Sequence, residues 1–493
     1  MAPLHLASSL ERVLVDPYAP AIGGAGQSVR RPGEPERSPL ELMTEAARQA
    51  SHRLLERVRS VAVVDCLSWP VPDPGALLAE ELGISADETV RTRTSGTGPL
   101  ELLADACTEI QAGRLDAALI AGAEAILPFK RALREGGSTG WPEQEPETAP
   151  SRVLGDERPA GHDAELAAGL LAPVHYYPWF ESALAAAATE TPEEHRERVA
   201  RLWRRFAEVA ATNPYGWTRD APPAERILAG PENRMVAFPY SKLMTANIQV
   251  DQGAAIVLCS SRVANEVAIR PEDRVYVHAS AAAQDHWFAA SRQDLHRSPA
   301  IAACGRATLG HAGLLVDEIE HLDLYSCFPS AVRIAAAELG VDLENAARAP
   351  TVTGGLTFAG GPGSNYVTHS LATMAERLRG DPGAYGFLTG VGWYMTKHAN
   401  ALLSARPPER PYVHAEPQAE VDALPRREIA TEPASPAEPV EAFTVLYERD
   451  GTPGQAIFSS LQPDGSRALG SSRDPELVQA LLAGEGTGQA QTS

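Results

Sequence analysis

The sequence predicts an α/β protein whose parallel sheet is covered by helices on both faces, with a small all-β module at the end of the chain. Three observations predict this. Strand-like runs alternate with helical segments in residues 1–125 and again in residues 235–405, and such alternation favours a covered parallel sheet. Residues 126–234 interrupt the alternation with Pro-, Gly- and Glu-rich sequence. Residues 406–493 combine alternating strand residues with two hairpin signals.

The first part of the chain shows the alternation most clearly. Residues 61–67 (VAVVDCL) are a β-branched run typical of a buried strand, and the helical spacing of residues 73–83 stops at a glycine. Residues 89–94 are the next expected strand. Residues 99–113 begin with Pro and end with Gly, which is the usual asymmetry of a helix. Residues 115–125 are a further buried strand that ends in small side chains.

Residues 126–234 are expected to form an insertion that lies over the core and covers a site, as long insertions in compact domains often do. They include the aromatic segment VHYYPWF (174–180) and a long helical segment, residues 193–211. After them, residues 251–260 (DQGAAIVLCS) predict a buried strand. The Gly-rich segment 354–370 then leads into another helix.

The end of the chain differs from the rest. The Pro-rich linker at residues 406–418 predicts a separate folding unit after it. Residues 449–451 (RDG) and 463–465 (PDG) are hairpin signals between strand-like runs. The final residues, 484–493, are expected to be a disordered tail.

Composition excludes several classes of function. The 493 residues carry 43 Lys and Arg against 64 Asp and Glu, a formal net charge of −21, which argues against binding nucleic acid or an anionic membrane surface. The five cysteines are scattered without a Cys-x-x-Cys pair, so neither a metal site nor a disulfide framework is expected. No apolar run reaches the roughly 18 residues that a membrane span needs, and residues 1–16 lack the basic start of a signal peptide. We therefore expect a cytoplasmic protein.

The stretch RTSGTG (residues 93–98) has the shape of a nucleophile turn. It offers a small reactive side chain, then glycines, then the start of a helix. Ser95 is the candidate nucleophile. A serine hydroxyl is far less acidic than a thiol and needs a base in contact with it. The turn therefore raises the question of where that base lies.

Four segments in order resemble a known family. RTSGTGPLELLADACTEIQAG is similar to the thiolase segment that holds the nucleophilic cysteine, and DQGAAIVLCS is similar to the DGAAA strand. DLYSCFPSAV is similar to the H-D-C-F or N-E-A-F motif, and GGLTFAGGPG to the G-G-x-x-x-x-G-H-P-x-G motif. Over about residues 15–405 the chain resembles the thiolase superfamily, in particular sterol-carrier-protein-x-type thiolases and bacterial acetyl-CoA acetyltransferase-like (thiolase-like) proteins.

The resemblance implies the thiolase fold, in which two βαβαβαββ halves pack as a five-layer α/β/α/β/α core. The N-terminal half would be residues 1–125 and 235–263, the loop-domain insertion residues 126–234, and the C-terminal half residues 264–405. Residues 406–493 would add a linker, a small all-β module similar to an oligonucleotide/oligosaccharide-binding barrel, and the tail. The resemblance also implies CoA or acyl-CoA as a ligand, acyltransferase chemistry and a role in lipid metabolism.

The positions that match the catalytic residues of thiolases differ here. Ser95 stands at the nucleophilic cysteine, Gly361 at the histidine of G-H-P, and Tyr325 at the His or Asn of the H-D-C-F or N-E-A-F motif. Residues 388–392, which match the region of the second cysteine, contain no thiol. Losing a nucleophile or its base can cost on the order of a millionfold in serine hydrolases. Ordinary thiolase activity is therefore not expected.

Three hypotheses stay open. In the first, the chain binds CoA or acyl-CoA thioesters, with no covalently bound cofactor and without ordinary thiolase chemistry. In the second, it is an acyltransferase with a rebuilt site of Ser95, Tyr325 and His369. In the third, the C-terminal β-module binds a protein partner or acts as a lid; few basic or aromatic residues disfavour nucleic acid there. Lys242, in PYSKLMTAN, is the candidate contact for a phosphate or pantetheine group.

Overall fold

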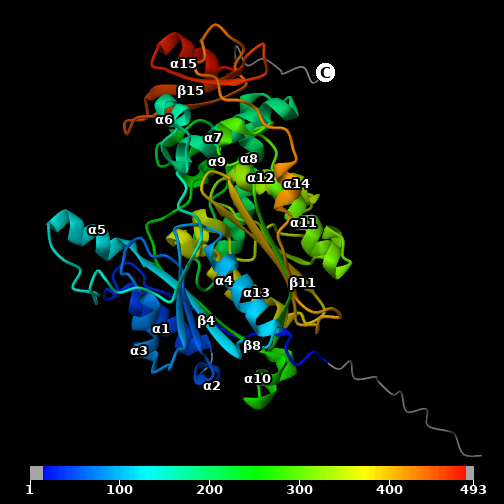
Figure 1. Ribbon diagram of the computed structural model, residues 1–493. Coiled ribbons are helices and arrows are strands. Elements are labelled where there is room, and N and C mark those ends of the chain that lie inside the picture. The colour runs from blue at the N-terminus through cyan, green and yellow to red at the C-terminus, as the bar shows by residue number, and fades with distance from the viewer. Residues whose placement is uncertain (1–14, 51, 485–493) are drawn as a thin grey trace, which may run out of the picture.

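A large mixed sheet forms the core of the protein (Figure 1). The computed structural model describes residues 15–50 and 52–484, so residues 485–493 of the expected tail lie outside the described residues. Across the sheet, the strands follow one another as β10 (His321–Asp323), β11 (Tyr385–Gly392), β12 (Lys397–Ser404), β9 (Val275–Gln284), β1 (Pro20–Val29), β8 (Asp251–Ser260), β4 (Ala117–Ala125), β2 (Ser60–Val63), β3 (Glu88–Thr92) and β5 (Arg152–Leu154).

The sheet is only partly parallel. The strands β2, β3, β4 and β5 pair in parallel, as do β10 and β11. In its middle, however, β8 runs antiparallel to both β1 and β4, and β12 runs antiparallel to β9 and β11. The last strand of each half therefore reverses direction, which the local strand and helix pattern did not predict.

Helices form three further layers. The outer helices of the first half are α1 (Pro39–Ala50), α2 (His52–Leu55), α3 (Pro74–Leu82) and α10 (Ser261–Glu266), and those of the second half are α11 (Pro299–Ala312) and α12 (Pro329–Leu339). Helices α4 (Gly98–Gln111) and α13 (Tyr366–Gly380) pack against strands of both halves. They form the middle of the five layers that were expected.

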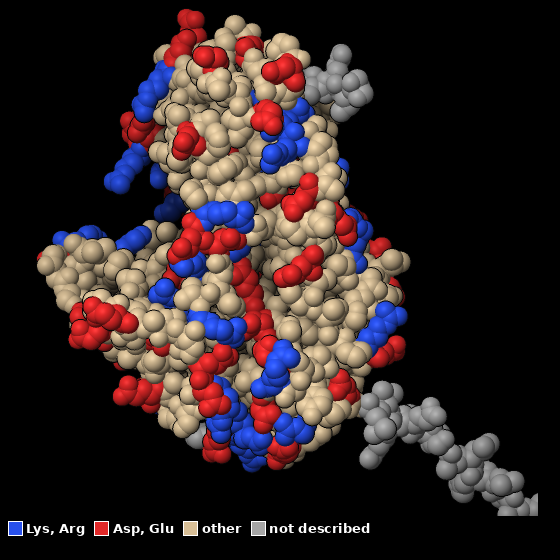
Figure 2. Space-filling view, in the orientation of Figure 1, with Lys and Arg blue, Asp and Glu red and all other residues tan. Residues whose placement is uncertain are grey.

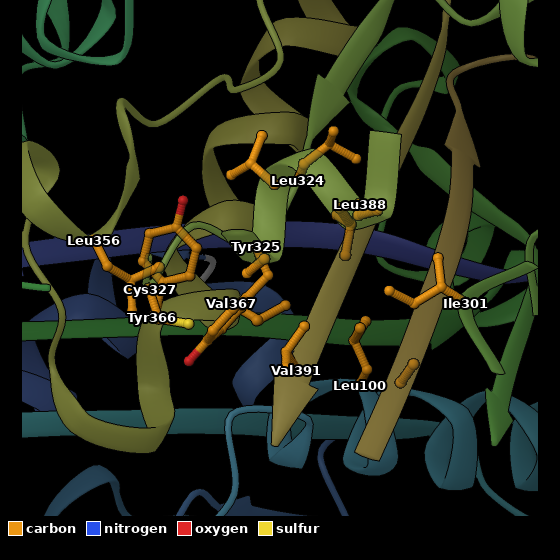
Figure 3. Packing of buried hydrophobic residues seen from close by; sticks show 14 of the residues in the cluster. Leu100, Ile301, Leu324, Tyr325, Cys327, Leu356, Tyr366, Val367, Leu388 and Val391 are labelled. Atoms are coloured by element: carbon orange, nitrogen blue, oxygen red, sulfur yellow. The ribbon is translucent and has the colours of Figure 1, made fainter. Parts of the chain in front are cut away.

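Apolar packing follows these layers. One cluster lies under the outer helices of the first half, around Leu42 and Leu119. The larger cluster surrounds the middle layer and includes Leu100 of α4 and Leu388 and Val391 of β11 (Figure 3). No described helix is long and apolar enough to cross a membrane.

Part of the insertion packs on the second half. The insertion contains α5 (Ile126–Glu135), α6 (Asp163–Ala168), α7 (Pro173–Ala188), α8 (Pro192–Thr212) and α9 (Ala224–Ile227). Helix α7 packs on α12, and α8 packs on the Gly-rich segment Gly355–Ala359. Helix α5 instead projects from the other side of the molecule (Figure 1).

The C-terminal segment does not build its sheet alone. The five strands of the second sheet are β16 (Arg467–Ser472), β15 (Pro453–Leu461), β14 (Ala442–Tyr447), β6 (Met235–Ala237) and β7 (Tyr240–Ser241). The two expected hairpin turns join β14 to β15 and β15 to β16. Two strands, however, come from residues 235–241, which were assigned to the first half. The segment also carries helices α14 (Gln418–Asp422) and α15 (Pro475–Leu482), so it is not purely β.

Beyond the second sheet, further contacts tie the C-terminal segment to the core. Its linker contributes β13 (Val413–Ala415), which pairs in parallel with β9. Beyond the linker, the fully buried Arg467 side chain holds the Glu441 carboxylate at 2.6 and 2.7 Å. The same guanidinium donates to the carbonyl oxygens of Ala290 and Arg292 at 2.7 and 2.6 Å. The segment is thus docked on the thiolase-like core rather than tethered loosely to it.

We expect Arg467→Met to lower the free energy of unfolding by about 3–5 kcal/mol, because breaking a buried pair leaves the partner charge uncompensated. Urea denaturation would measure the change. The matched control is Arg201→Met, which removes a surface guanidinium paired loosely with Glu197 at 3.6 Å and should change stability by less than about 0.5 kcal/mol. An unchanged urea midpoint for Arg467→Met would show that the buried Arg467–Glu441 pair is not needed for stability.

Candidate functional site

The turn that holds Ser95 lies where the two halves meet. It joins β3 to α4, and Ser95 is buried, with 4% of its surface exposed. The backbone N–H of Ser95 donates to the Ser364 hydroxyl at 3.1 Å. Ser364 belongs to the Gly-rich segment of the second half, directly before α13. The nucleophile turn and the G-G-x-x-x-x-G-H-P-like segment therefore converge, as the sequence predicted.

Two glycines make this approach close. A β-carbon on Gly96 would lie 2.2 Å from the Val391 carbonyl oxygen and 2.5 Å from the Tyr325 hydroxyl. A β-carbon on Gly392 would lie 2.3 Å from the Ser95 hydroxyl oxygen. Neither position accepts a side chain, so both glycines are needed for the Ser95 turn to contact β11. The structure thus brings Ser95 and Tyr325 to the same place, at the end of β11.

Tyr325 is a neutral hydrogen-bonding group in this site. Only 6% of its surface is exposed, and burial raises the pKa of its hydroxyl well above the usual value. Its backbone N–H donates to Thr389 at 2.8 Å, and its ring meets Tyr366 edge to face. Tyr325 lies in the apolar cluster with Tyr366 and Val391 (Figure 3). Its hydroxyl can donate to a carbonyl oxygen but does not supply a base.

His369 is turned toward the first half. It lies in α13, is 6% exposed, and its Nδ1 forms a 2.8 Å hydrogen bond with Gln27 of β1. Among the described residues its Nε2 has no hydrogen-bond partner. Burial lowers the pKa of His369 to about 3, so the ring is neutral. The hydroxyl of Ser95 bonds to Thr97 instead, at 2.6 Å. The rebuilt Ser95–His369 pair is therefore not formed in this conformation.

Gly361 and Lys242 are placed simply. The N–H of Gly361 donates to the Asn247 carbonyl at 2.9 Å, and an added β-carbon would meet ordinary contacts at 3.4–3.5 Å. A small side chain would fit there. Lys242 is exposed in a short 3₁₀ turn, Lys242–Met244, which follows the insertion. Its ammonium group is therefore free to reach a ligand only from the protein surface.

The side chains that contact Ser95 were missed by sequence reasoning. Thr97 accepts or donates at 2.6 Å to Ser95 and donates to Glu101 at 2.7 Å, and Lys397 pairs with the same Glu101 oxygen at 2.9 Å. Thr97 and Glu101 are four residues apart at the start of a helix, a spacing that places them on one face. That signal was present in the sequence. Lys397 comes from β12, and nothing local links it to Glu101.

A cavity of about 610 Å³ opens beside this group of side chains. It is lined by one face of α4, by the residues after β5, and by the ends of β9, β12 and β13, including Thr97, Glu101, Asp105, Glu109, Asp156 and Lys397. Acidic side chains gather along the hollow over α4 (Figure 2). In the described residues, no group of three or more His, Cys, Asp or Glu is placed to hold a metal ion.

The chain is similar to known proteins in its C-terminal segment and in its overall structure. Residues 416–492 match the model of the thiolase-like protein type 1 additional C-terminal domain. The crystal structure of a monomeric SCP2-thiolase like protein type 1 from Mycobacterium smegmatis is similar with a TM-score of 0.82 and 29% identity, over 96% of each chain. Among curated proteins, none matches the chain significantly by sequence.

Two more distant structures share the fold alone. An Ltp2-ChsH2(DUF35) aldolase has a TM-score of 0.58 and 19% identity, over 79% of this chain and 98% of that chain. The dimeric peroxisomal thiolase of Saccharomyces cerevisiae has a TM-score of 0.56 and 14% identity, with the same coverage. The resemblance drawn from the sequence is thus confirmed: the chain has the thiolase fold and is similar over 96% of its length to an SCP2-thiolase-like protein type 1.

Proposed function

We propose that the chain binds CoA or acyl-CoA thioesters and does not carry out ordinary thiolase chemistry. The observation that carries the proposal is the hydrogen bonding at the turn: the Ser95 hydroxyl bonds Thr97, while the one histidine suggested as its base bonds Gln27. The fold in which thiolases act on thioesters is kept, but the groups at the turn do not provide a thiolate and a base.

The cysteines near the site do not change this. Cys327 lies in the segment of Tyr325, is 8% exposed, and burial raises the pKa of its thiol to about 12. A thiol in that state is a poor nucleophile at neutral pH, because the thiolate is the reactive form. The other cysteines, Cys66, Cys107, Cys259 and Cys304, are also buried and free.

The binding region that we propose lies under the insertion. Helices α7 and α8 cover α12 and the Gly-rich segment, so a thioester reaching Ser95 would pass beside them. Lys242, exposed in the turn that follows the insertion, is the proposed contact for a phosphate or pantetheine group. We further propose a role in lipid metabolism and a protein partner for the C-terminal module.

A second candidate function is acyl transfer at a rebuilt site of Ser95, Tyr325 and His369. The closeness of the Tyr325 hydroxyl to the turn favours it, since a β-carbon on Gly96 would lie 2.5 Å from that oxygen. A carbonyl held there could accept a hydrogen bond from Tyr325. For His369 to act as the base, its Nε2 would have to come within hydrogen-bond reach of Ser95; among the described residues this atom has no partner, while Nδ1 donates to the Gln27 side-chain oxygen.

Thioester binding should be visible as stabilisation of the folded chain. A ligand at a hundred times its dissociation constant adds about 2.7 kcal/mol, so CoA and acetyl-CoA should raise the melting temperature in a thermal-shift titration. Lys242→Ala should weaken the apparent affinity several-fold. Lys130→Ala, a surface lysine of α5, is the matched control and should not. If no CoA compound shifts the transition at millimolar concentration, the binding proposal fails.

Thiolysis of acetoacetyl-CoA should stay at background in the purified chain. Ser95→Cys alone should not restore it, because the cysteine would still lack a base at the position of Gly361. A coupled assay for acetyl-CoA formation measures both proteins. Turnover by the unmodified chain that Ser95→Ala abolishes would contradict this prediction.

The second candidate makes a different prediction, which intact-mass spectrometry tests. Incubation with a suitable acyl-CoA should leave a covalent acyl group on Ser95, and Ser95→Ala should remove it. If His369 is the base, His369→Ala should also suppress the adduct by roughly 10²-fold or more in rate, the usual contribution of a general base. An adduct formed at an unchanged rate in that variant would eliminate His369 from the role.

A further inference from the structure

A chain of hydrogen bonds leads from Ser95 away from His369. The Ser95 hydroxyl lies 2.6 Å from the Thr97 hydroxyl, which donates to Glu101 Oε1 at 2.7 Å. The ammonium group of Lys397 lies 2.9 Å from that same carboxylate oxygen. Two consecutive hydrogen bonds thus connect the candidate nucleophile to a carboxylate, and a third contact pairs that carboxylate with a lysine.

The direction of the hydrogen bonds follows from the groups involved. A carboxylate paired with an ammonium group offers only acceptor sites, and a threonine hydroxyl carries one hydrogen. That hydrogen is directed at Glu101, so Thr97 has only acceptor capacity left for Ser95. Ser95 must therefore donate to Thr97. Its hydrogen points through Thr97 toward Glu101. The Ser95 oxygen also accepts the backbone N–H of Thr97 at 3.3 Å, so one lone pair remains for a reacting carbon.

The hydrogen-bond chain is buried at its Ser95 end and exposed to solvent at its Glu101 end. Ser95 and Thr97 are 4% and 1% exposed, whereas the side chain of Glu101 is 19% exposed and borders the 610 Å³ cavity over α4. A hydrogen-bond chain in a water-poor interior is stronger than the same chain in water. Protons can therefore leave from Glu101 through the cavity, while Ser95 stays shielded from water.

This arrangement offers Ser95 a proton acceptor. We propose that Thr97 and Glu101 take up the proton of Ser95 when its oxygen attacks the carbonyl carbon of an acyl thioester or an activated ester. The proposal rests on the acyl-transfer candidate above, but it assigns the base to Glu101 in place of His369. Lys397 is a positioning residue that holds the Glu101 carboxylate against Thr97.

The step balances without another reactant. A bond forms between Ser95 Oγ and the carbonyl carbon, and the carbon–sulfur bond of a thioester, or the carbon–oxygen bond of an ester, breaks. The Ser95 hydrogen moves to Thr97 as the Thr97 hydrogen moves to Glu101. Glu101 then releases its proton to solvent through the cavity, and the leaving thiolate or phenolate takes one up from solvent or departs as the anion.

The test uses p-nitrophenyl acetate, which does not depend on a CoA site. Release of p-nitrophenolate gives the rate, and intact-mass and peptide spectrometry locate the acetyl group. We expect acetylation of Ser95 in the full chain and none at that position in Ser95→Ala. Thr97→Val and Glu101→Gln should slow it by about 10²-fold or more, whereas Thr97→Ser restores the hydroxyl and should keep the rate within a few-fold.

The control variant is Asp105→Asn. Asp105 lies one turn further along α4, lines the same cavity and pairs with Arg152 at 2.7 Å. Its substitution therefore perturbs the same helix face without removing a hydrogen bond between Ser95, Thr97 and Glu101. Circular dichroism melts would show that all variants fold. A merely structural Thr97–Glu101 contact would lower the melting temperature and leave the acetylation rate unchanged, which would overturn the proposal. The absence of Ser95 acetylation in the wild type would also overturn the proposal, as would an adduct that requires His369 and not Glu101. Neither result would affect the binding of CoA thioesters in the thermal-shift assay.

Discussion

The close approach of the two halves at Ser95 is the constraint on which the site depends. The turn fits against β11 only because Gly96 and Gly392 have no side chains, and a β-carbon on either would collide at 2.2–2.3 Å. Packing this tight excludes water, so the buried polar groups of the turn need protein partners. The backbone N–H of Ser95 finds Ser364, and its hydroxyl finds Thr97. The side chains around the nucleophile position are thus selected by hydrogen-bond satisfaction as much as by chemistry.

Local patterns predicted the elements of the fold but not all of their pairings. The helix at residues 99–113 and the strand at residues 115–125 were expected from periodicity and are observed as α4 and β4. The hairpins of the C-terminal segment followed from their glycine turns. The pairing of β14 with β6 joins residues far apart in the chain, and β6 has only three residues. A strand so short carries no periodic signal, so its place in the second sheet depended on tertiary contacts.

The site was predictable to the extent that motifs mark backbone positions. The rebuilt-site hypothesis, which came from the family resemblance, placed Ser95 and Tyr325 together, and a β-carbon on Gly96 in the turn would lie 2.5 Å from the Tyr325 hydroxyl. The partner of His369 did not follow, since its position near a helix start leaves the ring direction undetermined. In the structure, the Nδ1 atom of His369 forms a hydrogen bond with Gln27 of the first half. The pairing of Lys397 was likewise not predicted, because its partner Glu101 lies in the other half of the fold.

The additional C-terminal domain and the turn are linked through one short loop between β11 and β12. Trp393 and Met395 in that loop have φ values of 54° and 55°, a conformation that costs non-glycine residues of order 1–3 kcal/mol and persists only where surrounding contacts hold it. Arg292 donates to the carbonyl of the intervening residue at 2.9 Å, and the carbonyl of Arg292 in turn accepts from the buried Arg467 of the C-terminal segment. The strained loop ends at Lys397, whose side chain holds Glu101. Two hydrogen bonds, continued by the backbone of residues 394–397, therefore connect the C-terminal segment to the lysine that holds Glu101 beside the Ser95 turn.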